Sequence, residues 1–350
     1  MKVCFVLPRF SRRPIGGYKI VYEYANRLSL VGHEVSLLFI NENTFIEYRV
    51  PAFLKNFCSY IMTKIEPRWF ELDESIEKIS GVAKISKKLK NVDVCIATGA
   101  ETVATCKELF PNGKKVYLIQ GFENWVMSED ELYKTYQEGF TNIVVSSWLE
   151  KIVNNYSKNR AVLIKNPIDL NVYFPNTPIE KRKTHSIGVL YHSDEHKGLK
   201  YSIKALEILK KKYPDLTVYM FGTSNPKETI PGLVKYIKDA SQMQTIELYN
   251  EISVFICSSI NEGYGLTAME AMACGAVVVS SDYEGIHEYG IEGVNCLLSP
   301  LRNPEALAQN VSKVFDDAEL RYKISKQGRE SLKAFDWKIA FDKFQKTIEQ

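Results

Sequence analysis

The segment Glu262–Gly275 (EGYGLTAMEAMACG) has the residue types of an anion-binding turn that leads into a short helix. Gly263 and Gly265 let the backbone approach a ligand closely. The helical pattern starts near Leu266 or Thr267, so the first amides of the helix and the positive end of its dipole lie there. This arrangement suits a diphosphate. Each charge–dipole contact contributes only about 0.3–1 kcal/mol, so several must act together.

Two carboxylates belong to this segment, Glu262 in the turn and Glu270 one turn inside the helix. Carboxylates that faced the phosphates would repel them, so we expect both to point at sugar or ribose hydroxyls. Glu270 has an alternative, because Thr267-x-x-Glu270 also fits a capping box in which the glutamate bonds back to the helix start.

The spacing of Glu262 and Glu270 matches an E-x7-E signature, and the whole string resembles the retaining glycosyltransferases of family 4 (group 1), which have the GT-B fold. The strings before and after it, LYNEISVFICSS and AVVVSSDYEGIHEYGIEGVNCLLSP, also resemble that family. Further matches lie in order along the chain: Gly16–Gly17, GHEVSLL at 32–38, NPIDLNVYFP at 166–175, and Lys197–Gly198. The string IQGFE at 119–123, followed by SSWL at 146–149, resembles one subgroup of that family.

The resemblance implies that Glu262 contacts the transferred sugar and that Glu270 contacts the nucleotide ribose. It implies that amides around Leu266 and Thr267 take the diphosphate, and that Lys197 offsets the phosphate charge. The alternative for Lys197 is an ordinary solvated lysine. The donor-binding residues expected in this way are Gly16, Gly17, His192, Lys197, Glu262, Gly263, Tyr264, Gly265, Leu266, Thr267 and Glu270.

The chain departs from the family pattern at two positions. His192 stands where an arginine is usual, and histidine is charged only near or below a pKa of ~6.5. Phosphate neutralisation is then weaker or is supplied elsewhere, and a packed neutral histidine is the alternative. Gln120 stands where many members have a histidine near the reacting carbon. Glutamine can orient a hydroxyl but cannot act as a base, whereas Glu123 could, unless both lie in a plain surface loop.

The candidate catalytic residues are therefore Glu262, Lys197, Gln120 and Glu123. No D-x-D motif occurs in the sequence, and its five histidines show no metal-ligand spacing. We expect a metal-independent enzyme that requires no cofactor and uses a nucleotide-diphosphate sugar as its donor substrate.

Strand and helix patterns alternate in two cycles, which predicts an α/β fold of two Rossmann-like domains facing across a cleft. Apolar runs at 2–8, 34–40, 92–97, 116–119 and 143–146 predict strands of the first domain, and the spacing at 74–89 predicts a helix. The second domain has predicted strands at 186–191, 216–221, 254–257 and 276–280. We place the domains at 1–170 and 171–332, with a C-terminal helix at 333–350 returning to the first domain.

Composition is that of an ordinary globular protein, with 350 residues, 45% hydrophobic and 25% charged. The net charge of +3 is too small to indicate nucleic acid as a partner. The seven cysteines are scattered without a CxxC pair, which favours reduced thiols. With no signal-peptide pattern or long apolar stretch, we expect a cytoplasmic protein. The aromatic-rich segment 53–70 and the lysines of 78–90 can contact the inner face of a membrane; a packed flap over a solvated helix is the alternative.

The resemblance implies retaining transfer of a hexose or deoxyhexose to a glycan or lipid-linked glycan acceptor, in bacterial surface polysaccharide synthesis. An alternative is a nucleotide-sugar-binding subunit without catalysis, since two expected polar groups are replaced. A nicotinamide oxidoreductase would explain the paired Rossmann pattern, but the chain lacks a GxGxxG loop with a following acidic residue.

Overall fold

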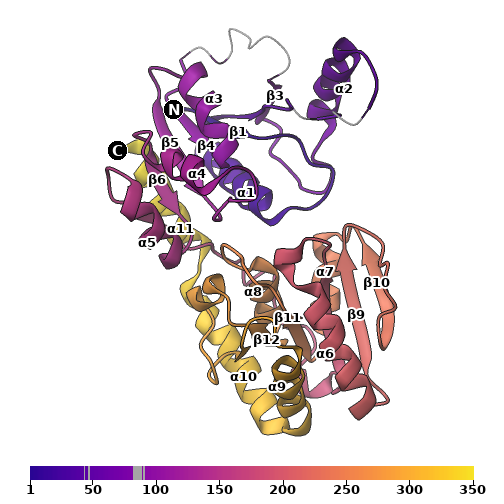
Figure 1. Cartoon of the computed structure of the whole chain (residues 1–350). Helices are drawn as coiled ribbons and strands as arrows, with labels where there is room; N and C mark the ends of the chain where they lie inside the picture. The colour runs from indigo at the N-terminus through magenta and orange to yellow at the C-terminus, as the bar shows by residue number, and fades with distance from the viewer. Residues whose placement is uncertain (43, 46–47, 82–88, 90) are drawn as a thin grey trace. The chain divides into compact units, whose positions relative to one another are not determined.

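The computed structural model describes all residues except 43, 46–47, 82–88 and 90, and it forms two compact units (Figure 1). The first unit consists of Met1–Lys165 and Ala340–Gln350, and the second of Asn166–Ile339. Each unit is a parallel sheet flanked by helices. The predicted α/β fold with two Rossmann-like domains is therefore confirmed.

In the described residues of the first unit, seven parallel strands pair in the order β3-β2-β1-β4-β5-β6-β7. The strands are β1 Lys2–Leu7, β2 Glu34–Phe39, β3 Glu77–Ser80, β4 Val94–Ala97, β5 Lys114–Ile119, β6 Thr141–Val144 and β7 Val162–Leu163. The sheet grows outward in both directions from the neighbours β1 and β4, so the chain reverses its direction of travel between them. Their carboxyl ends form a topological switch point, where α/β sheets bind ligands.

The helices of the first unit are α1 Gly16–Leu30, α2 Ala52–Ile65, α3 Val103–Leu109, α4 Glu129–Tyr136, α5 Ser147–Tyr156 and the end of α11 Trp337–Glu349. Helix α1 ends before Gly32, whose φ of 89° is in the left-handed region that favours glycine. Among the helices that the structure describes, none has the length and apolarity to cross a membrane.

The helix predicted at 74–89 is wrong where the structure describes it. Glu77–Ser80 forms strand β3, which pairs in parallel with β2 so that Ser36 faces Glu77 and Phe39 faces Ser80. The open edge of β2 supplies hydrogen-bond partners, and this tertiary pairing overrides the local helical pattern. The rest of the predicted helix falls largely on residues 82–88, outside the described part of the chain.

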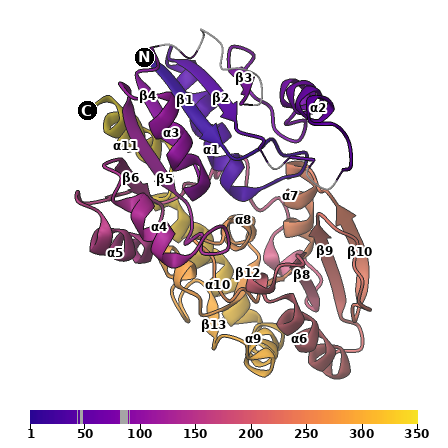
Figure 2. The same cartoon turned by 45° about the horizontal axis from the view of Figure 1, so that its top comes forward.

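The sheet of the second unit repeats the same topology with the order β10-β9-β8-β11-β12-β13 (Figure 2). Its strands are β8 Ser186–Tyr191, β9 Thr217–Gly222, β10 Leu233–Lys238, β11 Val254–Cys257, β12 Val277–Ser281 and β13 Leu297–Ser299. Its helices are α6 Leu199–Lys212, α7 Gln242–Glu251, α8 Leu266–Ala273, α9 Pro304–Asp316 and α10 Ala318–Ser331. Here the switch point lies between β8 and β11.

The C-terminal helix α11 closes the core of the first unit (Figure 1). Phe344 is fully buried and stacks on Tyr24 of α1, with ring centroids 4.0 Å apart. It also lies parallel to the ring of Phe5 in β1, at 6.4 Å. Aromatic pairs of this kind add about 0.5–1.5 kcal/mol beyond the area they bury. The last residues of the chain are thus part of the first unit's core.

Replacing Phe344 by alanine should lower the free energy of unfolding of the first unit by about 3–5 kcal/mol, because it leaves a cavity between α1 and β1. Urea titration monitored by circular dichroism measures this loss. The matched control is Lys343→Ala, which changes the exposed neighbour on the same helix. Equal stability of the two variants would contradict the packing described.

Candidate functional site

The turn before α8 is shaped around Gly265, which has φ 90° and ψ 52° and caps the helix that begins at Leu266. A Cβ at Gly265 would lie 2.0 Å from the hydroxyl oxygen of Tyr283. The Tyr289 hydroxyl donates to the Gly265 carbonyl at 2.6 Å. Burial raises the pKa of both tyrosines well above 10, so each phenol keeps its proton. The left-handed turn therefore requires glycine and is fixed by two tyrosines of the same unit.

The opposite end of α8 is capped by two arginines. Arg182 Nη2 donates to the Cys274 carbonyl at 2.6 Å, and Arg329 Nη1 donates to the Ala273 carbonyl at 2.8 Å. Burial lowers the pKa of Arg182 to about 10, which leaves it charged at neutral pH. Cations at a helix C-terminus complement its dipole. At the other end of α8, the first amides have no partner within the helix, and Gly265 at the cap position has no side chain to bond them.

Lys197 and Glu262 form an ion pair beside this turn. Lys197 Nζ lies 3.1 Å from Glu262 Oε2, and the two side chains are 23% and 9% exposed. The Ser259 hydroxyl donates to Glu262 Oε1. One oxygen of the carboxylate is thus held by the serine and the other by the ammonium group. Lysine has three donors, so Lys197 can contact an anion while it stays paired with Glu262.

Glu270 points away from the helix start, toward two tyrosines. The Tyr173 hydroxyl donates to Glu270 Oε1 at 2.9 Å, and the Tyr249 hydroxyl lies 3.4 Å from Oε2. Gln242 Nε2 donates to the Tyr173 hydroxyl at 3.2 Å. The capping box considered for Glu270 and Thr267 is not formed, because the cap position of α8 is Gly265, two residues before Thr267.

His192 follows β8 and lies near Lys197 and Glu262. Burial, Lys197 and His196 lower its pKa, against the opposite effect of Asp194. The backbone amide of Asp194 donates to His192 Nδ1 at 3.3 Å, which leaves the proton of the neutral ring on Nε2. The structure therefore favours a neutral histidine, which can donate a hydrogen bond but brings no positive charge.

The topology explains why these side chains meet. His192 and Lys197 follow β8, whereas Glu262 and Gly265 follow β11, and the two strands are neighbours at the switch point. The loops are packed closely, because a Cβ at Gly198 (φ 63°) would lie 2.0 Å from the Ser258 carbonyl. The second unit thus presents a lysine, a carboxylate and a helix start at one edge of its sheet.

The first unit gathers a second group at its own switch point. Gly16 and Gly17 open α1 after β1, and Gln120 follows β5. A Cβ at Gly17 would lie 3.3 Å from Gln120 Nε2, so the glycine gives room for the amide side chain. The structure therefore brings the predicted residues Gly17 and Gln120 together.

Glu123 belongs to the same group. The amide of Ala100, after β4, donates to Glu123 Oε2 at 2.6 Å. Burial raises the pKa of Glu123 to about 7, and Glu101 contributes to this rise, while the Ala100 amide and Tyr117 act against it. A carboxyl group with this pKa exchanges its proton near neutral pH, as an acid or base requires.

Sequence reasoning missed the residues that hold the site in place. Tyr283 and Tyr289 lie in the string SDYEGIHEYG, whose residue spacing gives no sign of their contacts with Gly265. Gly285 in the same string lets the backbone approach Glu262, since a Cβ there would lie 2.6 Å from the Glu262 carbonyl. Tyr173 lies 97 positions before its partner Glu270, and no local pattern signals such a pair.

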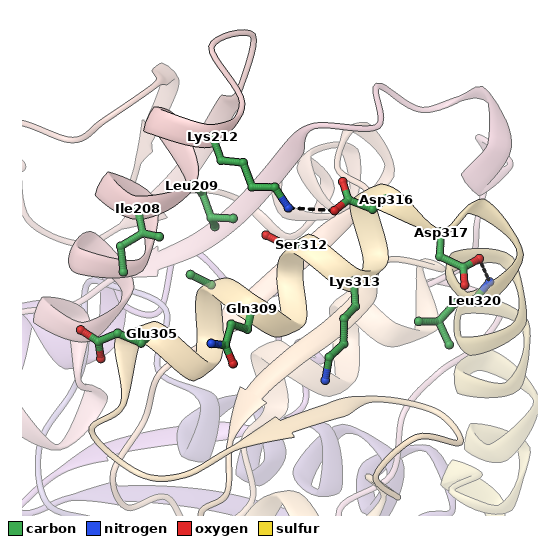
Figure 3. Close-up of a pocket in the computed structure, with 11 residues that line it drawn as sticks. Ile208, Leu209, Lys212, Glu305, Gln309, Ser312, Lys313, Asp316, Asp317 and Leu320 are labelled. Atoms are coloured by element: carbon green, nitrogen blue, oxygen red, sulfur yellow. Dashed lines mark hydrogen bonds and ion pairs between the residues drawn. The ribbon is translucent and has the colours of Figure 1, made fainter.

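No group of three or more His, Cys, Asp or Glu side chains that could hold a metal ion occurs among the described residues. A groove of about 790 Å³ lies elsewhere in the second unit, between α6 and α9 (Figure 3). It contains none of the predicted site residues. Its polar groups include the pair Lys212–Asp316, 2.8 Å apart, and Asp317, which caps α10 through the Leu320 amide. We therefore place the candidate site at the switch point and not in this groove.

One known protein family matches the second unit. Residues 177–331 match the model of the family described as "Glycosyl transferases group 1". The second unit matches this family. The matched region contains Lys197, Glu262, Gly265 and Glu270.

Curated relatives also carry glycosyltransferase names. An uncharacterized glycosyltransferase of Methanocaldococcus jannaschii is 26% identical over 208 residues, which cover 56% of this chain and 55% of the relative. The N,N'-diacetylbacillosaminyl-diphospho-undecaprenol alpha-1,3-N-acetylgalactosaminyltransferase of Campylobacter jejuni is 26% identical over 160 residues, which cover 44% and 42%. The chain spans about half the length of the curated relatives it matches.

Similarity of fold extends over both units. The crystal structure of Anabaena HepE in complex with UDP-glucose has a TM-score of 0.75 to this chain at 15% identity, and the match covers 100% of this chain and 99% of that one. At this identity the match shows the fold, which is GT-B. The family match covers residues 177–331, and the similarity that extends over both units is one of fold.

Replacing Gly265 by alanine should destabilise the second unit, because the methyl group collides with Tyr283. Gly293 is the matched control, since its φ of 70° is also positive but its Cβ would meet no atom within 4 Å. Gly293→Ala should cost only the left-handed strain of about 1–2 kcal/mol. Gly265→Ala should cost about 1–3 kcal/mol more, as overpacking does. Urea unfolding compares the two, and equal losses would contradict the described turn.

The raised pKa of Glu123 should make stability depend on pH. Between its unfolded value of about 4.5 and its folded value of about 7, the folded state binds more protons, so this group's contribution to stability falls as pH rises. Glu123→Gln should therefore gain stability relative to wild type between pH 5 and 8, by on the order of 3 kcal/mol. Chemical unfolding at a series of pH values measures this. Glu108→Gln, an exposed carboxylate of the same unit, is the control, and a pH-independent difference for Glu123→Gln would contradict the shift.

Proposed function

We propose that this protein is a retaining glycosyltransferase of family 4 that uses a nucleotide-diphosphate sugar as its donor. The observation that carries the proposal is the meeting of the Lys197–Glu262 ion pair with the uncapped start of α8. The family match over residues 177–331 supports it, because that region contains these residues. We propose further that the enzyme needs no metal ion or cofactor.

The donor diphosphate lies against the first amides of α8, at Leu266 and Thr267. Glycine at 265 lets the phosphate oxygens approach the backbone, and the dipole of α8 adds a positive potential there. Lys197 supplies the positive charge, and neutral His192 adds at most a hydrogen bond from Nε2. The free energy of diphosphate binding therefore comes from the amides of α8 and from Lys197, because His192 does not supply a second positive charge.

The two glutamates have separate tasks in this proposal. Glu262, fixed by Ser259 and Lys197, orients hydroxyls of the transferred sugar. Glu270, fixed by Tyr173 and Tyr249, accepts hydroxyls of the ribose. Neither attacks the sugar. A carboxylate with both oxygens already bonded is better suited to positioning than to forming a covalent intermediate.

Transfer then proceeds on the face from which the diphosphate departs, so that the anomeric configuration is retained. The bond between the anomeric carbon and the phosphate oxygen breaks while the acceptor oxygen forms its bond to that carbon. The leaving phosphate oxygen takes the proton of the acceptor hydroxyl. Lys197 and the amides of α8 stabilise the negative charge that develops on the diphosphate.

The first unit binds the acceptor, with Gln120 and Glu123 orienting its hydroxyl groups, while the proton of the attacking hydroxyl goes to the leaving phosphate oxygen. We propose a glycan or lipid-linked glycan as acceptor, in the synthesis of a bacterial surface polysaccharide. The Campylobacter jejuni relative, whose name places a diphospho-undecaprenol in its substrate, supports this class. The transferred sugar is a hexose or deoxyhexose, and the reaction takes place in the cytoplasm.

A nucleotide-sugar-binding subunit without catalysis is the second candidate. The lowered pKa of His192 favours it, because a neutral side chain in place of the usual arginine weakens the stabilisation of the leaving diphosphate. Binding of a donor without release of nucleoside diphosphate, even with acceptor present, would decide for this candidate.

Lys197→Ala should lower the rate of sugar transfer by about 10²–10³-fold, because it removes one stabilising group from the developing charge. The control is Lys200→Ala, an exposed lysine at the start of α6, which should keep the wild-type rate. Release of nucleoside diphosphate from a panel of nucleotide sugars measures both rates. Thermal shift with the same panel of nucleotide sugars identifies the donor. A ligand at 100 times its dissociation constant raises the free energy of unfolding by ~2.7 kcal/mol.

The proposal fails if Lys197→Ala turns over the donor at the rate of Lys200→Ala. Circular dichroism of both variants first shows that they are folded. Glu262→Gln extends the test, since it keeps the shape of the side chain but loses the charge that pairs with Lys197.

A further inference from the structure

Helix α2 of the first unit has its polar side chains inside and its apolar side chains outside. The buried members of this 14-residue helix are Ser59 and Thr63, which are 1% and 0% exposed. Phe53 and Phe57, in contrast, are 69% and 60% exposed. A surface helix of a globular protein normally buries its apolar stripe. The inverted arrangement of α2 therefore needs an explanation.

The inner face of α2 is held by hydrogen bonds. Asn41 Nδ2 donates to Thr63 Oγ1 at 2.9 Å and to Ser80 Oγ at 3.1 Å, which ties α2 to the end of β2 and to β3. These bonds fix which side of the helix faces the protein. The exposure of the apolar side is thus a built feature of the fold.

Helix α2 lies at the edge of the first unit, beside β3 (Figure 1), and its outer face carries six exposed apolar side chains. Its exposed apolar residues fall within an arc of about 140° at 100° per residue, a single helix face. We call this surface the α2 face. It consists of Phe53, Leu54, Phe57, Tyr60, Ile61 and Ile65. Exposed apolar patches of this kind mark interaction sites.

The charge around the α2 face is positive. Residues 48–65 contain Arg49, Lys55 and Lys64, and the Lys64 ammonium group also donates to the Lys78 carbonyl. The nearest carboxylates in the sequence are Glu47 and Glu66, of which Glu66 is buried. Exposed Arg12 adds to the positive charge, because its Nη2 lies 3.4 Å from the sulfur of Met62 on α2. Aromatic and aliphatic side chains with flanking cations are the composition of helices that lie in the surface of an anionic bilayer.

We propose that the α2 face docks on an anionic lipid bilayer, with the helix lying in the plane of the interface. Phe53, Phe57 and Tyr60 enter the boundary between headgroups and acyl chains, and the arginines and lysines contact lipid phosphates. The mode is that of an interfacial helix, which lies on the membrane and does not span it.

Docking of α2 on a bilayer would explain how the enzyme meets a lipid-linked acceptor, and this part of the inference rests on the proposed function. Helix α2 follows the carboxyl end of β2, and Gly17 and Gln120 lie at the same carboxyl edge of that sheet. A bilayer under α2 would therefore hold a lipid-linked acceptor near the edge where the first unit presents its polar groups. Vesicle binding itself requires neither donor nor acceptor, so it is tested separately from transfer.

The first experiment is co-sedimentation of the full chain with vesicles of phosphatidylcholine, and with vesicles of phosphatidylcholine mixed with phosphatidylglycerol. We expect the protein to sediment with the anionic vesicles and to be released as salt is raised. Phe53→Ser combined with Phe57→Ser should weaken binding by about tenfold or more, because two aromatic side chains no longer leave water. The control is Leu30→Ser combined with Val31→Ser, two exposed apolar residues elsewhere on the first unit, which should bind like wild type.

The second experiment uses Cys58, the exposed cysteine on α2; the other six cysteines are buried. An environment-sensitive dye on its thiol should shift its emission to the blue when anionic vesicles are added. This readout reports on α2 itself, so it distinguishes docking through α2 from attraction of the whole protein to the vesicles.

Three results would overturn the proposal. The first is that the protein stays in the supernatant with anionic vesicles. The second is that the Phe53/Phe57 variant, shown to be folded by circular dichroism, binds as strongly as the Leu30/Val31 variant. The third is that the protein does not bind vesicles but forms a dimer in analytical sedimentation, and that the Phe53/Phe57 variant is a monomer. The α2 face would then be a protein interface. The rate of sugar transfer to a water-soluble acceptor should be equal in all of these variants. If the wild type transfers no sugar at all, the proposed enzymatic function is contradicted, whereas the proposed docking on vesicles is still decided by the binding experiments.

Discussion

The direction in which helix α8 presents its free amides is the constraint on which the second unit's site depends. Arg182 and Arg329 satisfy carbonyls at its C-terminal end, and Tyr289 holds the carbonyl of Gly265 at the other end. The helix is therefore fixed in position, while its first amides have no partner within the helix itself. An eight-residue helix has few hydrogen bonds of its own, so these contacts with distant parts of the unit define it.

The same topology creates a polar edge in each unit. In the second unit the neighbours β8 and β11 end beside each other and bring Lys197 to Glu262. In the first unit the neighbouring strands β1 and β4 also end beside each other. The loop after β5, the next strand of the sheet, adds Gln120 and Glu123 at this edge. The electrostatics of the two edges differ. The second carries an ion pair next to a helix start, and the first carries a carboxyl group whose burial raises its pKa to about 7.

Much of this could be predicted from the sequence, because the signals are local. Strands β8 and β11 lie at their predicted bounds, since short apolar runs between turn residues are reliable signs of buried strands. The spacing of the glycines also predicts the turn at Gly265 and the start of α8. The pairs Lys197–Glu262 and Tyr173–Glu270 could not be derived from spacing, because they depend on which strands become neighbours. Strand β3 was missed for the same reason, and β10 because its exposed residues lack the apolar pattern of a buried strand.

The most direct test of the account is a crystal structure of the protein with a nucleotide-diphosphate sugar that the donor panel has identified. The account predicts that the diphosphate lies on the amides of Leu266 and Thr267, with Lys197 Nζ within hydrogen-bond distance of a phosphate oxygen. A diphosphate bound in another pocket, with the turn at Gly265 open to solvent, would contradict it.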